Sequence, residues 1–152
     1  MPLPFTILYR SPETLGADRI AAVAGAHNKF DDTAVLVIDA GTAVTYDLLL
    51  KNGTYPGGNI SPGMATRFRA LNQFTGRLPL VKEGKQESLL GTDTEGAIRA
   101  GVQTGLIFEI NEYIRTFKNK YEDLGGNYNR WGESFSEGIY QFFIYFCTGF
   151  NY

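Results

Sequence analysis

Apolar residues along the chain alternate between the two-residue period of strands and the wider spacing of helices. Residues 5–9 form a short apolar run typical of a strand. A helix-start signature at residues 11–13 precedes apolar positions at helical spacing, which predicts a helix to about residue 26. Residues 34–38 are rich in β-branched side chains, and residues 44–50 form a second predicted strand after a tight Ala-Gly turn. This part of the chain therefore predicts a strand, a helix and a β-hairpin.

The second half of the pattern predicts one more short strand and two helices. The stretch TYPGGNISPGM places turn-forming residues around a short extended piece at residues 59–61, and a helix is expected near Pro62. Asp93 and Thr94 can cap a long helix. Its apolar positions recur at helical spacing: Ile98, Val102, Leu106, Ile110, Tyr113 and Phe117. The order of elements predicts an α/β layer structure with a partly antiparallel sheet.

Composition narrows the class of protein. The 152 residues are 43% hydrophobic and 20% charged, which suits one domain with a real core. A net charge of −2 and the lack of a long basic cluster argue against binding to nucleic acid or anionic membrane, so small-molecule partners are favoured. No apolar run approaches the roughly 20 residues that span a bilayer. The single cysteine agrees with a reducing compartment, and we expect a cytoplasmic protein.

The stretch DAGTAVTYD follows an apolar strand and concentrates polar chemistry there. Asp39 ends the predicted strand, and Gly41 and Thr42 come directly after it. Glycine lets the backbone approach an anion closely, a hydroxyl can donate to a phosphate oxygen, and a carboxylate can hold a cation. An ordinary hairpin with polar turn residues is an equally good interpretation of this motif alone. Asp47 is interpreted as a surface residue at the end of a strand.

A second group of polar residues opens the first predicted helix. Asp18 and Arg19 lie in its first turns, where an acid suits the helix dipole. An Asp there could accept a hydroxyl proton during phosphoryl transfer, and an Arg could grip a carboxylate or phosphate. By themselves, the two residues are better explained as a helix-start Asp and a surface Arg.

Two glycine-rich segments, residues 56–63 and 91–101, precede or open helices. Free N–H groups at such a helix start can cradle an anion. Turns and close helix packing explain the glycines equally well, so neither segment decides between a site and a structural role.

Five segments occur together in the order and spacing of the type III pantothenate kinases: YRSPETLGADRIAAV, VIDAGTAVTYD, GGNISPGM, ALNQFTGRLP and GTDTEGAIRAG. The chain resembles that family over residues 2–123. The resemblance implies a ribonuclease-H-like domain with a mixed sheet and flanking helices, as in the acetate and sugar kinase, Hsp70 and actin superfamily. Residues 1–124 would form the second half of a two-domain kinase. Its reaction would be the ATP-dependent phosphorylation of pantothenate to 4′-phosphopantothenate, the first step of coenzyme A synthesis.

The resemblance also implies roles for single residues. Asp18 would be the catalytic base that deprotonates the primary hydroxyl of pantothenate. The substrate site would be lined by six residues: Tyr9, Gly16, Ala17, Asp18, Arg19 and Thr94. Asp39 would hold a monovalent cation, K⁺ or NH₄⁺, and Thr42 would contact ATP. Mg²⁺ would be a further cofactor of the reaction. The family forms homodimers that share the substrate site, so a homodimer is expected, with no nucleic-acid or membrane partner.

The chain departs from the family's pattern at its start. The family begins with a domain that carries a D-x-G-N-T phosphate loop, and these 152 residues contain no such segment. Since positioning supplies most of the rate in phosphoryl transfer, we expect this chain alone to be inactive. The alternatives are a non-catalytic module that binds pantothenate without ATP, and an interaction protein that binds no ligand.

Residues 125–152 also lose the family's pattern and become rich in aromatic side chains. Reading the possible codons of residues 124–133 one base later permits L-V-V-I-I-T-G-G-E, close to the strand and T-G-G-D of the family. We therefore hypothesise a one-base frameshift near Leu124, with residues 125–152 a tail not native to the family. The alternative is a genuine tail that contacts a membrane or a partner. Resequencing the DNA around Leu124 distinguishes them, because reads without a missing or extra base would contradict the frameshift.

Overall fold

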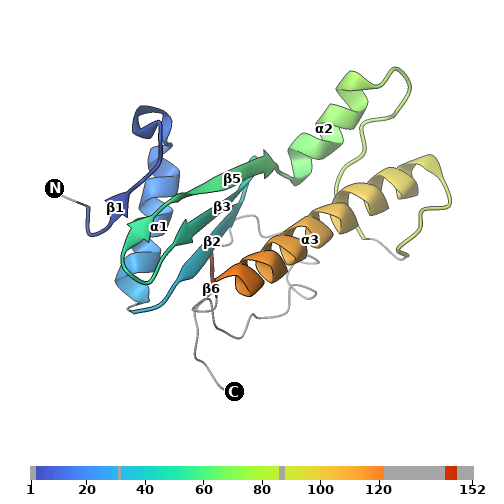
Figure 1. Cartoon of the computed structure of the whole chain (residues 1–152). Helices are drawn as coiled ribbons and strands as arrows, with labels where there is room; N and C mark the ends of the chain where they lie inside the picture. The colour runs from blue at the N-terminus through green and yellow to red at the C-terminus, as the bar shows by residue number, and fades with distance from the viewer. Residues whose placement is uncertain (1–2, 31, 86–87, 122–142, 147–152) are drawn as a thin grey trace.

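The computed structural model describes residues 3–30, 32–85 and 88–121, together with the backbone of residues 143–146 (Figure 1). Most of the predicted tail, residues 125–152, therefore lies outside the described residues. The elements confirm a mixed α/β protein. In chain order they are β1 (Thr6–Ile7), the 3-10 helix η1 (Pro12–Thr14), α1 (Ala17–Lys29), β2 (Val35–Ala40), β3 (Ala43–Leu49), β4 (Thr54–Tyr55), β5 (Gly57–Pro62), α2 (Met64–Phe74), α3 (Thr94–Lys120) and β6 (Phe143–Phe146).

The main sheet has four antiparallel strands in the order β5-β3-β2-β6. Its centre is the predicted hairpin, β2 and β3, in which Asp39 pairs with Thr45 and Ala40 with Val44 next to the turn. Strands β1 and β4 form a separate parallel pair. The sequence pattern predicted β1 but not β4. The hairpin prediction is confirmed, and the third strand is longer than the three residues expected.

The two faces of the hairpin pack against different helices, as the alternation of side chains along a strand requires. One core cluster contains Leu36, Ile38, Val44, Tyr46 and Leu48 with the inner faces of α2 and α3. The other contains Val35, Val37 and Leu49 with Val23 and Ala26 of α1 and with Phe5 and Tyr55. Figure 1 shows α1 and α3 on opposite sides of the sheet. Odd-numbered positions of β2 and β3 thus face α1, and even-numbered positions face α3.

The first predicted helix is divided in two. Pro12–Thr14 forms only a 3-10 turn, closed by the Thr14 amide donating to the Ser11 carbonyl at 3.0 Å. Leu15 then adopts an extended conformation and is buried with Phe5 and Val23. The continuous helix begins only at Ala17, after Gly16 as its N-cap, and continues to Lys29. The prediction of a helix that starts at residues 11–13 was therefore wrong, because burial of Leu15 interrupts the helical backbone, and the helix ends three residues beyond the predicted end at about residue 26.

The long helix α3 agrees with its prediction. Asp93 caps it, since its carboxylate accepts a hydrogen bond from the Gly96 amide at 2.9 Å. Ile98, Val102, Leu106 and Ile110 lie in the core, and Tyr113 stacks on Tyr46 with ring centroids 4.0 Å apart. In the described part of the chain, none of the helices combines the length and the apolar character needed to cross a membrane.

Candidate functional site

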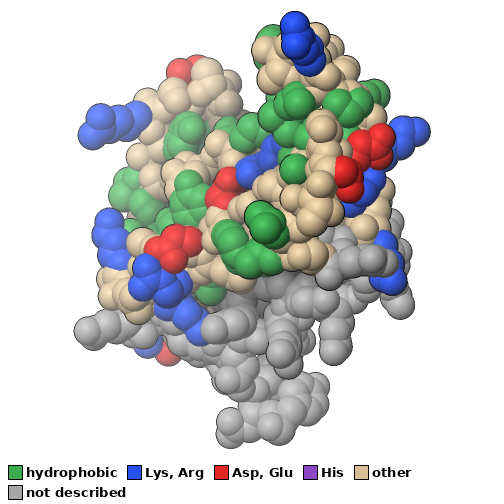
Figure 2. Space-filling model, turned by 90° about the vertical axis from the view of Figure 1, so that its right-hand side faces the viewer, with side chains coloured by type: hydrophobic (Ala, Val, Ile, Leu, Met, Phe, Trp, Pro, Cys, Tyr) green, Lys and Arg blue, Asp and Glu red, His purple; other side chains and the backbone are tan. Residues whose placement is uncertain are grey.

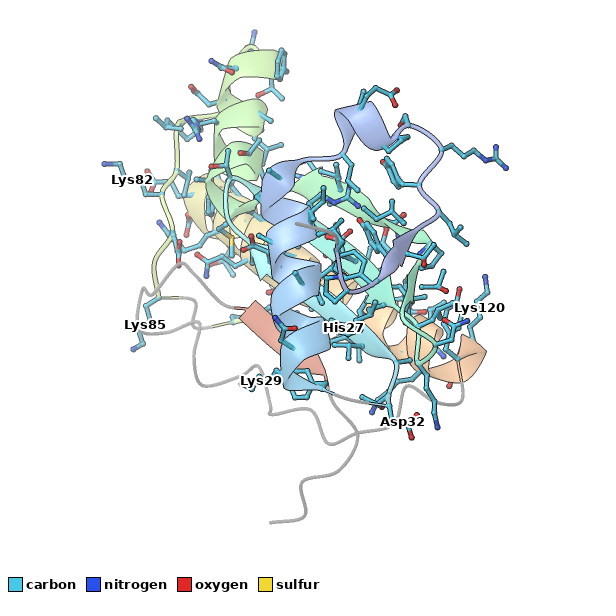
Figure 3. The ribbon with its side chains drawn as sticks, turned by 90° about the vertical axis from the view of Figure 1, so that its left-hand side faces the viewer. His27, Lys29, Asp32, Lys82, Lys85 and Lys120 are labelled. Atoms are coloured by element: carbon cyan, nitrogen blue, oxygen red, sulfur yellow. The ribbon has the colours of Figure 1, made fainter. Side chains whose placement is uncertain are left out.

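The start of α1 presents the GADR segment at one end of the sheet. Gly16 is the N-cap, and Ala17 and Asp18 are exposed in the first turn. The Asp18 carboxylate folds back over the helix start, since a Cβ added to Gly16 would lie 2.3 Å from Asp18 Oδ1. Gly16 thus leaves the space that this carboxylate occupies. In Figure 3 the labelled His27 and Lys29 mark the opposite, C-terminal half of α1.

Asp39 lies near the end of β2, half-buried, at an odd-numbered position of the α1 face. Its carboxyl pKa is raised, first by burial and then by the negative charges of Asp18 and Asp47. Repulsion of this kind acts only over a short range, so the structure brings the acid of the GADR segment and the acid of the DAGT segment to the same face of the sheet.

Replacement of Asp39 by Asn is expected to stabilise the fold at neutral pH. Because the pKa of Asp39 is raised above the ordinary value of about 3.9, the folded state binds the proton more tightly than the unfolded state. Stability therefore falls as pH rises through the interval between these two values, and the full penalty is present at pH 7. Urea unfolding of Asp39→Asn and wild type from pH 3 to pH 8 should show the variant's advantage shrinking toward acid pH.

Asp32 is exposed, and Asp32→Asn is the control for removing one carboxylate charge in that measurement. An Asp39→Asn variant less stable than wild type at pH 7 would contradict the repulsion.

The Gly41-Thr42 turn between β2 and β3 is hydrogen-bonded to the start of α2. The Thr42 carbonyl accepts hydrogen bonds from the Gly63 amide at 3.0 Å and from Thr66 Oγ1 at 2.8 Å. A Cβ on Gly63 would lie 2.0 Å from the Gly41 carbonyl oxygen, so this glycine serves close packing. The Thr42 residue itself is exposed on a fixed backbone.

Asp47 corrects the interpretation of a strand-end surface residue, because it is completely buried in β3 on the α1 face. Arg19 Nε donates to Asp47 Oδ1 at 3.0 Å and to Oδ2 at 3.2 Å, and Arg19 Nη2 donates to Oδ1 at 2.5 Å. The Tyr55 hydroxyl donates to Oδ1 at 2.6 Å. We call Arg19, Asp47 and Tyr55 the Asp47 cluster.

Arg19 likewise is no surface residue, since only 5% of it is exposed. Burial alone lowers the pKa of Arg19, but the hydrogen bonds and charge of Asp47 outweigh that effect and raise it, so the guanidinium stays charged. Burial and the hydrogen bond to Asp47 raise the pKa of Tyr55, so its hydroxyl stays a donor. Sequence reasoning missed Tyr55, because nothing in the pattern distinguishes it from the other tyrosines of the chain.

Tyr9 joins this side of the sheet as well. Its ring lies 5.5 Å from the Arg19 guanidinium carbon, and a Cβ on Gly57 would lie 3.3 Å from Tyr9 Cδ2. The structure therefore brings Tyr9, the GADR segment and Asp39 together around the N-terminal end of α1. Thr94 is not part of this group, since it opens α3 on the other side of the sheet.

Gly58 of β5 leaves room for the buried ion pair. A Cβ at this position would lie 2.3 Å from Asp47 Oδ1, 2.9 Å from Arg19 Nη2 and 2.2 Å from the Tyr46 carbonyl oxygen. We expect Gly58→Ala to destabilise the protein by about 1–3 kcal/mol through this overpacking. Gly105→Ala is the matched control, because a Cβ there meets no atom within 4 Å and should stabilise α3 by about 1 kcal/mol. Thermal unfolding of both variants checks the prediction, and equal melting temperatures would contradict it.

In the part of the chain that the structure describes, no three His, Cys, Asp or Glu side chains gather closely enough to hold a metal ion. The candidate site consists of the start of α1, the end of β2 and the turn between β2 and β3. It carries the neighbouring carboxylates of Asp18 and Asp39 and the exposed hydroxyl of Thr42. Such groups suit proton transfer and the binding of a monovalent cation and a phosphate-bearing ligand.

Several known proteins share much of this sequence. The family model described as type III pantothenate kinase matches residues 1–116. A type III pantothenate kinase of Bacteroides fragilis is 54% identical over 123 residues, which cover 81% of this chain and 51% of that protein. One of Porphyromonas gingivalis is 52% identical over 116 residues, 74% of this chain and 47% of that protein.

A solved structure is similar as well. It is titled a conserved putative Baf family transcriptional activator from Campylobacter jejuni, with a TM-score of 0.50 and 29% identity over 72% of this chain and 49% of that one. The chain spans about half the length of the curated relatives it matches. Because the family model covers well over half of its 152 residues, this chain belongs to the type III pantothenate kinase family.

Proposed function

We propose that this chain forms the pantothenate-binding half of a kinase that converts pantothenate and ATP to 4′-phosphopantothenate and ADP, the first step of coenzyme A synthesis. The observation that carries the proposal is geometric: Asp18 lies in the first turn of α1, and Asp39 lies at an odd-numbered position of β2, on the face of the sheet that α1 covers. A sheet with α1 on one face and α2 and α3 on the other supports a ribonuclease-H-like domain over residues 1–124. The cytoplasm is the expected compartment.

In this proposal, Asp18 accepts the proton of the primary hydroxyl of pantothenate. The hydroxyl oxygen then bonds to the γ-phosphorus of ATP, the bond from that phosphorus to the bridging oxygen breaks, and ADP leaves. Asp18 is exposed in the first turn of α1 and is accessible to such a substrate. Gly16, Ala17 and Tyr9 surround that turn and would line the substrate site, and Arg19 lies buried beside them.

Asp39 would hold the monovalent cation, K⁺ or NH₄⁺. The arrangement suits such an ion, because a cation beside this half-buried carboxylate would offset its repulsion from Asp18 and Asp47. Thr42, exposed on the fixed turn, would donate its hydroxyl to ATP. Mg²⁺ would be held largely by the phosphates of ATP, as this ion usually is.

Thr94 would reach pantothenate only from a second subunit, because within one chain α3 and α1 lie on opposite faces of the sheet. A homodimer that shares its substrate site satisfies this requirement. The space-filling view of Figure 2 looks at the side of α2 and α3, where hydrophobic side chains lie among charged ones. Phe74 of α2 is 85% exposed and Phe108 of α3 is 59% exposed, which supplies apolar surface for a partner.

A chimera tests the proposed reaction. The part of the Bacteroides fragilis relative that this chain does not match is joined to residues 1–124, and pantothenate-dependent ADP release is measured by a coupled assay with and without K⁺. Turnover that requires both pantothenate and K⁺ is expected, with the complete Bacteroides fragilis protein as the positive control. If neither the chimera nor the chain turns over or binds pantothenate, the proposal is wrong.

The alternative is a module that binds pantothenate without phosphorylating it, and the gathering of Tyr9, Gly16 and Asp18 at the start of α1 suits such binding as well. Calorimetry of the chain alone distinguishes the two functions. Binding by the chain and turnover by the chimera support the kinase half. Binding by both without turnover by either supports the module.

The shared substrate site has its own test, a mixture of two inactive chimeras, Asp18→Asn and Thr94→Ala. In a two-fold dimer whose site takes Asp18 from one subunit and Thr94 from the other, each mixed dimer keeps one intact site. Random mixing should therefore restore up to about a quarter of the wild-type rate. No recovery after subunit exchange would contradict a site shared in this way.

A further inference from the structure

The Asp47 cluster is adjacent to the proposed catalytic base, Asp18. Arg19 follows Asp18 in the chain, and its guanidinium is held at both Nε and Nη2 by a carboxylate that is itself fixed by the Tyr55 hydroxyl. The cluster connects three elements, α1, β3 and β4, within a buried space. It therefore fixes the position of the first turn of α1 relative to the sheet that carries Asp39.

The contacts leave Arg19 little capacity for direct substrate binding. Its side chain is 6% exposed, and Nε and Nη2 already donate to Asp47. A bidentate guanidinium–carboxylate pair sets orientation as well as distance, because the planar fork fits the two oxygens in one geometry. Among the described residues, every buried side-chain oxygen and nitrogen has at least one hydrogen-bond partner, those of this pair included.

We propose that Asp47 and Tyr55 are positioning residues for the kinase reaction: they hold Arg19, and through it the first turn of α1, so that Asp18 points at the hydroxyl of the substrate. This inference rests on the proposed function of Asp18. It assigns Arg19 an anchoring role in place of a direct contact with pantothenate. Small errors in the placement of a reacting group are costly, and a displacement of about 1 Å can lower a rate by about 100-fold.

The chain contains a matched control for this idea on the opposite face of the sheet. Tyr46 is as deeply buried as Tyr55, and its hydroxyl also donates to a carboxylate, Glu109 Oε1, at 2.8 Å. Glu109 is in turn bound by Arg67. Tyr46→Phe and Tyr55→Phe therefore each remove a hydroxyl that donates to an arginine-paired carboxylate, with Glu109 25% exposed and Asp47 fully buried, and of the two tyrosines only Tyr55 is connected to α1.

Two measurements on these variants test the proposal. The first is amide hydrogen exchange of Ile20, whose N–H donates to the Gly16 carbonyl at 3.2 Å and closes the first turn of α1. In Tyr55→Phe this exchange should be about 10-fold faster than in Tyr46→Phe, because the buried Asp47 carboxylate beside α1 loses the Tyr55 hydroxyl that donates to it. This readout uses the chain itself and needs no activity.

The second measurement is steady-state kinetics of the chimera with Tyr55→Phe, Tyr46→Phe or Arg19→Lys. Tyr55→Phe should lower kcat by about 10-fold to 100-fold with KM for pantothenate nearly unchanged, whereas Tyr46→Phe should leave both parameters close to wild type. Arg19→Lys keeps the charge but loses the fork, and should follow Tyr55→Phe. A rise in KM with kcat unchanged for Arg19→Lys would instead show a direct substrate contact and overturn the anchoring role.

The two readouts separate this inference from the function on which it rests. Faster Ile20 exchange together with a selective loss of kcat supports the inference. Equal Ile20 exchange in Tyr55→Phe and Tyr46→Phe overturns it, and so does faster exchange with an unchanged kcat, while the kinase assignment stands in both cases. An inactive wild-type chimera that also fails to bind pantothenate refutes the proposed function and with it any positioning role, whatever the exchange shows.

Discussion

Asp18→Asn is expected to lower kcat of the chimeric kinase by about 100-fold to 10,000-fold, the usual contribution of a general base. The amide keeps the size of the side chain and the start of α1, but it cannot accept the hydroxyl proton. Pantothenate affinity should change little, because the base acts mainly in the transition state. Single-turnover kinetics and calorimetry on the same preparation measure the two quantities.

Asp32→Asn is the control for the loss of a carboxylate, since Asp32 is exposed and lies beyond the C-terminal end of α1, away from the helix start that carries Asp18 (Figure 3). A kcat for Asp18→Asn within about threefold of wild type would contradict a general base, whose contribution is far larger.

Asp47→Asn is expected to reduce the free energy of unfolding by about 3–5 kcal/mol, because it leaves the buried Arg19 guanidinium without its counter-charge. Arg19 is 5% exposed and Asp47 is fully buried, so water cannot compensate for the lost carboxylate. Such a loss is a large fraction of the total stability of a small domain. Urea unfolding followed by circular dichroism measures it on the chain itself.

The surface pair of Arg115 and Glu112 provides the comparison, as both side chains are more than half exposed. Glu112→Gln should leave the unfolding midpoint unchanged within error, because exposed ion pairs contribute little. If Asp47→Asn and Glu112→Gln unfold at the same urea concentration, the buried pair does not have the energetic role that its geometry indicates.

Local chemistry made several parts of the fold predictable. The hairpin follows from a β-branched run and a second, largely apolar run around an Ala-Gly turn, and α3 follows from a capping Asp93 and apolar residues at helical spacing. These features depend on neighbours within a few positions of the chain, so the sequence contains the whole signal. Asp39 was identifiable as a candidate because it ends a predicted strand, whereas the role of Asp18 came from the resemblance of its segment to the kinase family.

The errors arose where a long-range contact overrides a local pattern. Burial of Leu15 against Phe5 ended the first helical turn early and moved the start of α1 to Ala17. Asp47 looked like a surface residue because an isolated carboxylate belongs in water. Its partners Arg19 and Tyr55 lie 28 and 8 positions away in the chain, so the residues adjacent to Asp47 give no sign of these partners.

The sequence by itself determined the order of the main elements, the cap of the long helix, and the segments whose order and spacing resemble type III pantothenate kinases. Only the tertiary structure decided that Arg19 is buried against Asp47, that Asp18 and Asp39 share one face, and that Thr94 lies on the other. The reason is physical: local backbone preferences are set by adjacent residues, whereas the burial and pairing of charges depend on which strands and helices meet in space.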